Sequence, residues 1–202
     1  MKKNTKSKKH FPPPVNEPQP LVQPPQELKL DLGCGDNKQP GFTGVDFVKT
    51  SQTDVVHDLK QYPWPFEDNS VSEVYCSHFF EHLNGSERIK FMEELYRVLK
   101  VGGKAMVISP YYSSMRAHQD PTHQWPGVCD ATMLYFNRSW REANKLSHYL
   151  GNNEVDFDFA IYYQLDPTWA SRAEDARNFA IRHYMNVVND IQFNLIKREP
   201  RK

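Results

Sequence analysis

Apolar residues in the first half of the folded sequence fall in short runs that are broken by turn-forming residues, and this pattern predicts strands. The runs are rich in branched aliphatic and aromatic residues, and Gly, Pro, Asn, Asp or Ser stands between them. The predicted strands are Leu28 to Leu32, Phe42 to Phe47, Asp54 to Leu59, Val71 to Ser77 and Lys104 to Ser109.

A helical period replaces this pattern between the fourth and fifth strands. From Ser86 to Lys100 the apolar residues recur three and four positions apart, which predicts an amphipathic helix. Its apolar face consists of Ile89, Phe91, Met92, Leu95, Val98 and Leu99. Ser86 is a plausible N-cap, and Gly102-Gly103 is expected to end the helix.

The pattern after the fifth strand is less regular. The segment from Tyr111 to Asp130 is a long loop rich in His, Pro, Asp and aromatic residues, and loops of this length in compact domains are usually functional. The remaining predicted elements are a helix from Asn137 to Tyr149, a strand from Glu154 to Gln164, a helix from Pro167 to Met185 and a strand from Asp190 to Lys197. Strands separated by loops and helices imply an α/β fold, in which ligands bind at the carboxyl ends of parallel strands.

The turn after the first strand is the most informative local feature. Asp31 precedes Gly33-Cys34-Gly35, where the glycines permit positive φ and keep side chains away from a ligand. Asp46 closes the next strand, and its carboxylate can accept two hydrogen bonds from a ribose diol. A dinucleotide site needs a third glycine and a helix facing the pyrophosphate, whereas residues 36–41 have the composition of a loop. A cofactor without phosphates, built from ribose, adenine and an amino-acid tail, fits better.

From about Glu27 to Tyr112 the chain resembles the class I S-adenosylmethionine (SAM)-dependent methyltransferases, whose first motif is an acid-x-Gly-x-Gly turn. It is most similar to predicted bacterial and phage methyltransferases in which the first helix is shortened to a loop. The resemblance implies SAM as the cofactor and a Rossmann-like, mainly parallel sheet of about seven strands flanked by helices, with one antiparallel strand. The cofactor-binding residues it implies are Asp31, Gly33, Cys34, Gly35, Asp46, Phe47, Asp58, Leu59 and Ser77.

Two of these positions have distinct roles in the family. The acid after the second strand holds the ribose hydroxyls, and Asp46 matches that position. Asp58 matches an acid that often hydrogen-bonds the adenine amino group, and Leu59 would then pack on the ring. The alternative for Asp58 is a cap at the end of a strand.

His78, Glu81 and His82 have the H-x-x-E-H spacing of some zinc hydrolases. That chemistry needs both histidines on one face of a sustained helix, whereas His78 ends a predicted strand and Asn84-Gly85 breaks any helix after His82. The resemblance implies instead that His78 faces the methyl donor, while Glu81 and His82 cap or pack. The Asn/Asp-Pro-Pro-Tyr/Phe motif of many nucleic-acid amino methylases is absent here, which counts against a DNA adenine or cytosine N4 methylase.

His118, Asp120 and His123 follow the fifth strand, at the rim where a substrate should sit. A histidine there could take a proton from a hydroxyl or amine, and a neighbouring Asp would orient its ring. The same three side chains could hold a divalent metal, or the loop could be tied by its own hydrogen bonds around an Asp120-Pro121 turn. An Asp-Pro-Thr-His stretch resembles one that follows strand five in the same methyltransferases. The predicted catalytic residues are His78, Asp120 and His123, and no metal ligand is assigned.

The 202 residues favour one folded domain. Residues 1–27 are rich in lysine and proline and predict a disordered tail, which leaves a SAM-methyltransferase-like domain at 28–202. A formal net charge of zero disfavours long-range attraction to nucleic acid or to an anionic membrane, although the basic tail favours an anionic partner. Three cysteines without paired spacing and the lack of a membrane-length apolar run in the sequence indicate a reducing, cytoplasmic compartment.

The predicted function is transfer of a methyl group from SAM to an oxygen or nitrogen nucleophile of a small molecule or a saccharide. The missing first helix, the missing third glycine and Val71-Ser72-Glu73 in place of an aromatic-acid pair depart from the family pattern. They keep a second hypothesis open, a SAM-fold module that binds without turnover. A zinc hydrolase is the third, and it predicts stoichiometric bound metal.

Overall fold

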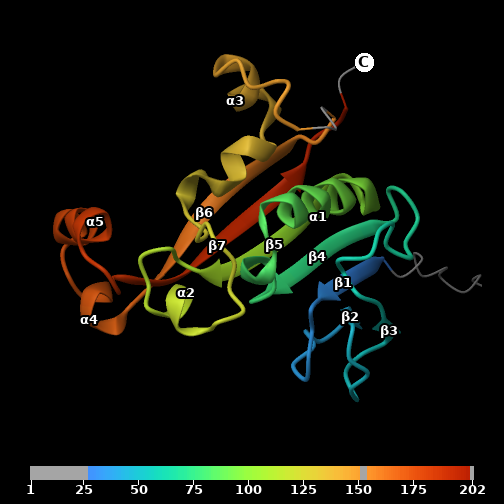
Figure 1. Cartoon of the computed structure of the whole chain (residues 1–202), viewed down its shortest axis with the longest axis horizontal. Helices are drawn as coiled ribbons and strands as arrows, with labels where there is room; N and C mark the ends of the chain where they lie inside the picture. Colours follow the sequence, from blue (N-terminus) through green and yellow to red (C-terminus); the bar gives the residue numbers. More distant parts are fainter. Residues whose placement is uncertain (1–26, 151–153, 201–202) are drawn as a thin grey trace, which may run out of the picture.

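The computed structural model describes residues 27–150 and 154–200. Seven strands form one sheet in the order β3-β2-β1-β4-β5-β7-β6 (Figure 1). The strands are β1 (Leu28–Leu32), β2 (Thr43–Asp46), β3 (Val55–Val56), β4 (Val71–Ser77), β5 (Leu99–Pro110), β6 (Phe157–Leu165) and β7 (Val188–Lys197). The predicted Lys/Pro-rich tail lies outside the described residues except for Glu27.

Strand direction follows the expected plan. β1 pairs in parallel with β2 and β4, β2 pairs in parallel with β3, and β4 with β5. β7 is inserted between β5 and β6 and runs antiparallel to both. Among the described strands β7 alone opposes the others, so the prediction of a mainly parallel sheet with one antiparallel strand is confirmed. Because β7 is reversed, its first residues lie at the edge where the parallel strands end.

Seven short or medium helices accompany the sheet in the described part of the chain. They are η1 (Phe80–His82), α1 (Gly85–Val98), α2 (Arg116–Gln119), η2 (Asp130–Phe136), α3 (Arg138–Ala143), α4 (Pro167–Ala170) and α5 (Glu174–His183). α1 lies along one face of the sheet, and α4 and α5 project beyond its end at the left of Figure 1.

The core lies between α1 and the sheet. Phe91 and Leu95 of α1 and Val74, Val107 and Phe193 of the strands are all essentially inaccessible to solvent and belong to one hydrophobic cluster. Burial alternates along β4, where positions 71, 74 and 76 are buried and the intervening ones are half-exposed. The period of two holds from Val74 to Ser77, whereas the register of β4 shifts between Val71 and Glu73.

The helix after β4 begins and ends earlier than predicted. Its N-cap is Asn84, whose side chain accepts from the Glu87 amide, while the Glu87 carboxylate accepts from the Asn84 amide. This reciprocal capping box satisfies two amides that Ser86 could not reach, so the Ser86 N-cap was wrong. The helix ends at Val98, and Gly102-Gly103 lies inside β5 rather than at the helix end.

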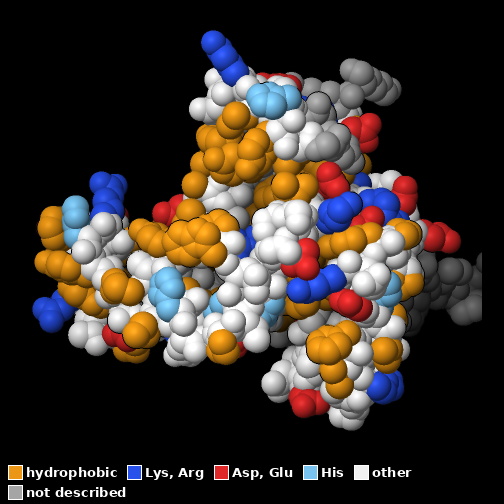
Figure 2. Space-filling view, viewed as in Figure 1, with side chains coloured by type: hydrophobic (Ala, Val, Ile, Leu, Met, Phe, Trp, Pro, Cys, Tyr) orange, Lys and Arg blue, Asp and Glu red, His pale blue; other side chains and the backbone are white. Residues whose placement is uncertain are grey.

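Several other element boundaries also differ from the predictions. The third strand has two residues, and the helix predicted from Asn137 to Tyr149 ends at Ala143, since Lys145 takes a positive φ of 59°. The single helix predicted from Pro167 to Met185 is two helices, because Ala173 is extended with φ −58° and ψ 150°. Exposed hydrophobic side chains gather over these two helices at the left-hand end of Figure 2. Within the described ranges no helix has the length and hydrophobicity to cross a bilayer.

Candidate functional site

The residues with predicted chemistry collect at the carboxyl ends of the parallel strands. The glycine turn follows β1, Asp46 ends β2, His78 follows β4 and the loop at residues 111–130 follows β5. α2 and that loop lie beside the β4 and β5 strand ends (Figure 1). This edge is where open α/β sheets bind ligands.

The glycine turn has the geometry that the sequence predicted. Gly33 has φ +72° and Gly35 has φ +49°, both in the left-handed region. A Cβ at position 33 would lie 3.1 Å from Phe79, so the turn and the segment after β4 are in direct contact there. At position 35 a Cβ would meet nothing within 4 Å, so this side of the turn is open to a ligand.

Asp46 is brought to the glycine turn, as expected. Its Oδ2 accepts from the Gly35 amide at 2.9 Å and its Oδ1 accepts from the Val48 amide at 2.9 Å. A carboxylate offers about four acceptor sites, so each oxygen retains capacity for a ribose hydroxyl. Phe47 is 70% exposed beside it, and Val48 and Val56 are also exposed. A carboxylate with spare acceptors next to uncovered apolar side chains fits a nucleoside.

Asp31 and Cys34 support the turn from inside. The Asp31 carboxylate is buried and its Oδ2 accepts from the Gln39 amide at 2.7 Å, which anchors the loop that replaces a first helix. Burial raises the pKa of Asp31. Burial and the nearby carboxylates of Asp31 and Asp46 raise the pKa of the Cys34 thiol, so this cysteine is a protonated packing residue.

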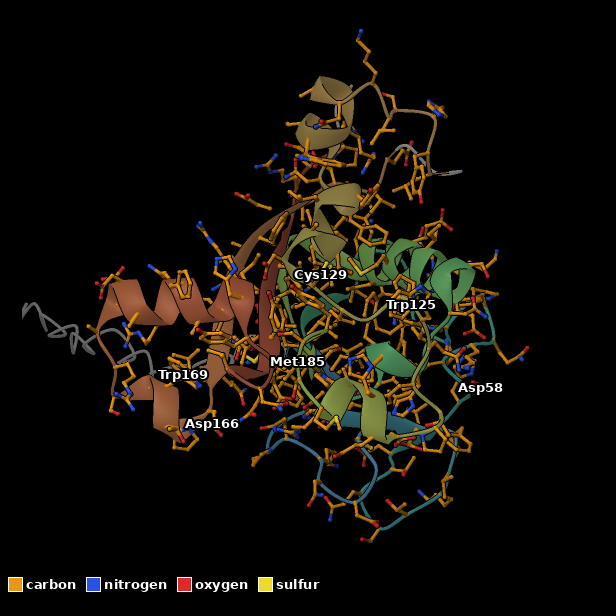
Figure 3. The ribbon with its side chains drawn as sticks, turned by 60° about the vertical axis from the view of Figure 1, so that its left-hand side comes forward. Asp58, Trp125, Cys129, Asp166, Trp169 and Met185 are labelled. Atoms are coloured by element: carbon orange, nitrogen blue, oxygen red, sulfur yellow. The ribbon has the colours of Figure 1, made fainter. Side chains whose placement is uncertain are left out.

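Three other predicted cofactor residues take up different surroundings. Asp58 is exposed, and its Oδ1 accepts from the Lys60 amide at 2.9 Å, which is the geometry of a turn cap. In Figure 3 it lies at the right-hand side of the molecule. Leu59 is buried in the core, so its side chain does not face solvent. Ser77 is the half-buried last residue of β4. Their contact with a cofactor stays a prediction.

A polar cluster forms where β4 and β5 end. His78 has a positive φ of 56°, an uncommon conformation for a residue other than glycine. Its Nδ1 lies 3.3 Å from Glu81 Oε1, and the buried Ser109 hydroxyl donates to Glu81 Oε2 at 3.0 Å. The hydrogen bond to Glu81 raises the pKa of His78 against the opposing effect of burial. His78 lies before η1 rather than on a helix with His82, so the H-x-x-E-H helix of a zinc hydrolase is not formed.

Asp190 completes this cluster, and sequence reasoning missed it. It is 3% exposed, its Oδ2 accepts from Arg116 at 2.7 Å and lies 4.0 Å from His78 Nε2, and its Oδ1 has no partner in the described chain. Burial raises its pKa against the effect of Arg116. The available signal was an acid at the first position of the last predicted strand, which reaches this edge only when that strand is antiparallel.

The three candidate residues of the loop after β5, His118, Asp120 and His123, make different contacts. His118 Nε2 lies 2.9 Å from the Tyr112 carbonyl oxygen, in hydrogen-bonding contact that holds it within the loop. His123 instead packs edge-on against His82, with ring centroids 4.8 Å apart. The Asp120 carboxylate accepts from the Thr122 hydroxyl at 2.7 Å, which lowers its pKa. His78 and the pair Asp120 and His123 are thus separate groups, and Glu81 and His82 of η1 lie between them.

An apolar groove of about 590 Å³ opens beside this loop. Tyr112, Trp125, Cys129 and Met185 are among its lining residues, and the last three are labelled near the middle of Figure 3. Trp125 is 82% exposed. Because the Trp125 ring is exposed to solvent at the wall of the groove, it can pack on a bound ligand.

Comparisons with known proteins agree with this geometry. Residues 30–107 match a family model described as a methyltransferase domain. The fold is similar to a solved SAM-dependent methyltransferase from Archaeoglobus fulgidus, with 21% identity, 85% of this chain and 86% of that chain covered, and a TM-score of 0.57. No curated protein matches the sequence.

Two further solved structures have the same fold. The YcgJ protein from Bacillus subtilis is 16% identical over 86% of this chain and 93% of its own, with a TM-score of 0.50. A putative sarcosine dimethylglycine methyltransferase from Galdieria sulphuraria is 16% identical over 86% of this chain and 78% of its own, with a TM-score of 0.51. The predicted resemblance to methyltransferases is confirmed over residues 30–107, and these solved structures confirm the predicted fold. The bacterial and phage subgroup stays a prediction.

Proposed function

We propose that this protein moves a methyl group from SAM to an oxygen or nitrogen nucleophile. The match of residues 30–107 to a methyltransferase-domain model supports this proposal. The acceptor in this proposal is a small molecule or a saccharide.

One contact carries the proposal. Phe79 packs against Gly33 of the cofactor turn, and His78 immediately precedes it in the polar cluster with Glu81 and Asp190. The turn that suits a nucleoside and a cluster that suits a nucleophile are therefore joined by one side chain. Methyl transfer needs this kind of adjacency, because the donor and the acceptor must meet in line.

The protein's own groups have separate tasks. Bound SAM supplies a methyl group on a positively charged sulfonium, which is already a good leaving group. Asp46 holds the ribose through the free acceptor sites of its carboxylate. His78 donates Nδ1–H to Glu81, which leaves Nε2 to take a proton from the acceptor. Asp190, 4.0 Å from Nε2, stabilises the imidazolium that results.

The size and lining of the groove support a small-molecule or saccharide acceptor. Its volume of about 590 Å³ falls within the usual range for small-molecule sites. The ring of Trp125 provides a flat apolar wall, and the zero net charge gives no field that would gather a polyanion. The proposal includes a cytoplasmic location, supported by cysteines 34, 76 and 129, which are all free.

One observation favours a second candidate, a SAM-binding module without turnover. The amides of Gly33 and Cys34 donate to the Val45 carbonyl, and that of Gly35 donates to Asp46. The turn therefore keeps its own donors occupied, and fewer face the carboxylate of the cofactor. The two candidates differ in whether S-adenosylhomocysteine is ever formed.

Calorimetric titration with SAM and with S-adenosylhomocysteine tests the cofactor half of the proposal. Asp46→Asn should weaken binding of both by at least about tenfold, since a hydrogen bond to a charged group is worth about 1.5–3 kcal/mol. Glu174→Gln, an exposed change on α5, is the matched control and should bind like the wild type. Equal affinity in Asp46→Asn would contradict the ribose contact.

Turnover tests the other half. The wild type is incubated with SAM and pools of hydroxyl- and amine-bearing metabolites and oligosaccharides, and S-adenosylhomocysteine is measured. A pool-dependent product that is lost in His78→Asn, while that variant still binds SAM, is the expected result. Tight SAM binding without product from any pool would favour the module.

A further inference from the structure

We infer that Glu81, His82 and His123 form a binding site for one divalent transition-metal ion. One ligand atom from each of these three side chains lies within 4.8 Å of the other two. His82 and Glu81 come from η1 after β4, and His123 comes from the loop after β5. The inference concerns metal binding and does not depend on the proposed methyl transfer.

The protonation of His82 is fixed by a chain of hydrogen bonds. The Thr122 hydroxyl has one hydrogen, which it donates to Asp120 Oδ1 at 2.7 Å. Thr122 Oγ1 lies 2.9 Å from His82 Nδ1 and must accept there. Nδ1 of His82 therefore carries the proton, and Nε2 presents a lone pair.

His123 reaches the same state by a different contact. Its Nδ1 lies 3.2 Å from the Ala117 carbonyl oxygen, which can only accept, so Nδ1 carries the proton. Nε2 of His123 is then the nitrogen left to bind a metal, and it lies 3.9 Å from Asp120 Oδ2. Metal-binding histidines usually give their second N–H to a carbonyl or to a hydroxyl–carboxylate pair, because this fixes both tautomer and ring orientation. Both histidines show this arrangement in the described structure.

Glu81 supplies the charge. Its carboxylate is 4% exposed, and it takes one hydrogen bond on each oxygen, from His78 and from Ser109. Each oxygen keeps a further acceptor site for a cation. Two imidazoles and one carboxylate are a donor set that suits zinc and other borderline divalent ions.

The separation of the ligand atoms fits an ion after a small movement. Bonds of about 2.0–2.1 Å in a tetrahedral site put ligand atoms about 3.4 Å apart. The ligand atoms now lie within 4.8 Å of one another, so the most distant pair must approach by up to about 1.4 Å when one ion binds all three side chains. Three protein ligands leave the fourth position of a tetrahedral ion open to water or to another ligand.

The backbone already holds the two segments together. The Gln124 amide donates to the Glu81 carbonyl at 2.8 Å, and Arg88 donates to the carbonyls of Pro126 and Gln124. His123 is thus docked beside η1 by contacts that do not involve its ring. This preorganisation lowers the entropic cost of assembling a metal site.

Titration of the tag-free full chain with Zn²⁺ and with Co²⁺, after chelator treatment, tests the inference. One ion per chain should bind, and bound Co²⁺ should give the visible absorption of a low-symmetry site. His82→Gln and His123→Gln should each weaken binding at least tenfold, and Thr122→Val should weaken it about 10–100-fold by freeing the His82 ring. His118→Gln, in the same loop, is the matched control and should bind as the wild type does.

Two results would overturn the inference. One is the absence of saturable binding to the wild type. The other is equal metal affinity in His123→Gln and His118→Gln, with circular dichroism showing that both are folded. Either outcome leaves the SAM titrations untouched, because those depend on Asp46 at the end of β2, which is not among the three proposed metal ligands.

Discussion

The two ends of the site are built from different interactions. At the β1–β2 end, carboxylates accept from backbone amides within the same short stretch, as Asp46 does from Gly35 and Asp31 does from Gln39. At the β4–β5–β7 end, side chains meet side chains across distant parts of the chain, as Arg116 and Asp190 do. The first end is a rigid backbone cradle, and the second is a cluster of titratable groups.

Under the proposed function, this difference separates two tasks: the β1–β2 end (the cofactor end) holds the methyl donor, and the β4–β5–β7 end (the acceptor end) meets the acceptor. A cofactor shared by a whole family can be held by backbone geometry, which tolerates sequence change. An acceptor that differs between enzymes must be met by side chains, which can be replaced without rebuilding the sheet. The cofactor end should therefore be sensitive to backbone strain, and the acceptor end to changes in charge.

The largest effect is expected from a pair of glycine changes at the cofactor end. Gly33→Ala adds a Cβ 3.1 Å from Phe79 at a φ of +72° and should destabilise the fold by about 2–4 kcal/mol. Gly35→Ala has the same backbone cost but open space, and should lose only about 1 kcal/mol. Urea unfolding measures both. An equal loss of unfolding free energy in the two variants would contradict a steric clash between the new Cβ and Phe79.

A smaller effect is expected from Arg88→Met at the acceptor end. The change leaves the carbonyls of Gln124 and Pro126 without their buried donor and should cost about 1–3 kcal/mol. Hydrogen exchange should speed up in the loop after β5, while the glycine turn stays protected. Lys90→Met, an exposed change on the same helix, is the control. Uniform exchange throughout the chain would contradict local docking by Arg88.

The pH dependence of Asp31→Asn sharpens the comparison further. The folded-state pKa of Asp31 is raised above its ordinary 3.8 because the carboxylate is buried. The favourable contribution of the protonated form is present below 3.8 and is lost as the pH rises through the folded-state pKa. Asp31→Asn should therefore gain stability relative to the wild type between about pH 4 and pH 7. Urea unfolding across that range measures this, and a pH-independent difference would contradict it.

The smallest effect is expected from Asp190→Asn. Asp190 is buried with one oxygen unpaired, and its partner Arg116 is 45% exposed and can turn to water. The free energy of unfolding should stay within about 0.5 kcal/mol of the wild type or increase. SAM affinity should stay within about twofold. A marked loss of SAM affinity would show that the two ends are not independent.

The local signals in the sequence predicted the sheet and the cofactor end well. The period-two runs gave β1 and β4 with their observed bounds, and the two glycines with Asp46 predicted a turn closed by a carboxylate. The bonds that close the turn are local, since Gly35 is 11 positions from Asp46 and 15 positions from Thr50. Asn84-x-x-Glu87 was also a readable capping signal, and it was missed in favour of Ser86.

The acceptor end could not be predicted because its contacts depend on the fold. Arg116 and Asp190 are 74 positions apart, and they meet only because β7 enters the sheet reversed. His82 of η1 and Thr122 of the loop after β5 are 40 positions apart. The break between α4 and α5 carries no glycine or proline, so no local residue marked it.

The reversed last strand has a consequence for the order in which the domain assembles. β1 and β2, which carry the glycine turn and Asp46, both lie within residues 28–46. β5 instead pairs with β7, which begins 78 positions after β5 ends. On a ribosome, the cofactor cradle can close while Asp190 is still unsynthesised. We expect a chain halted before β7 to hold its nucleoside turn only transiently. During synthesis the chain would therefore form the cofactor half of the site before the acceptor half.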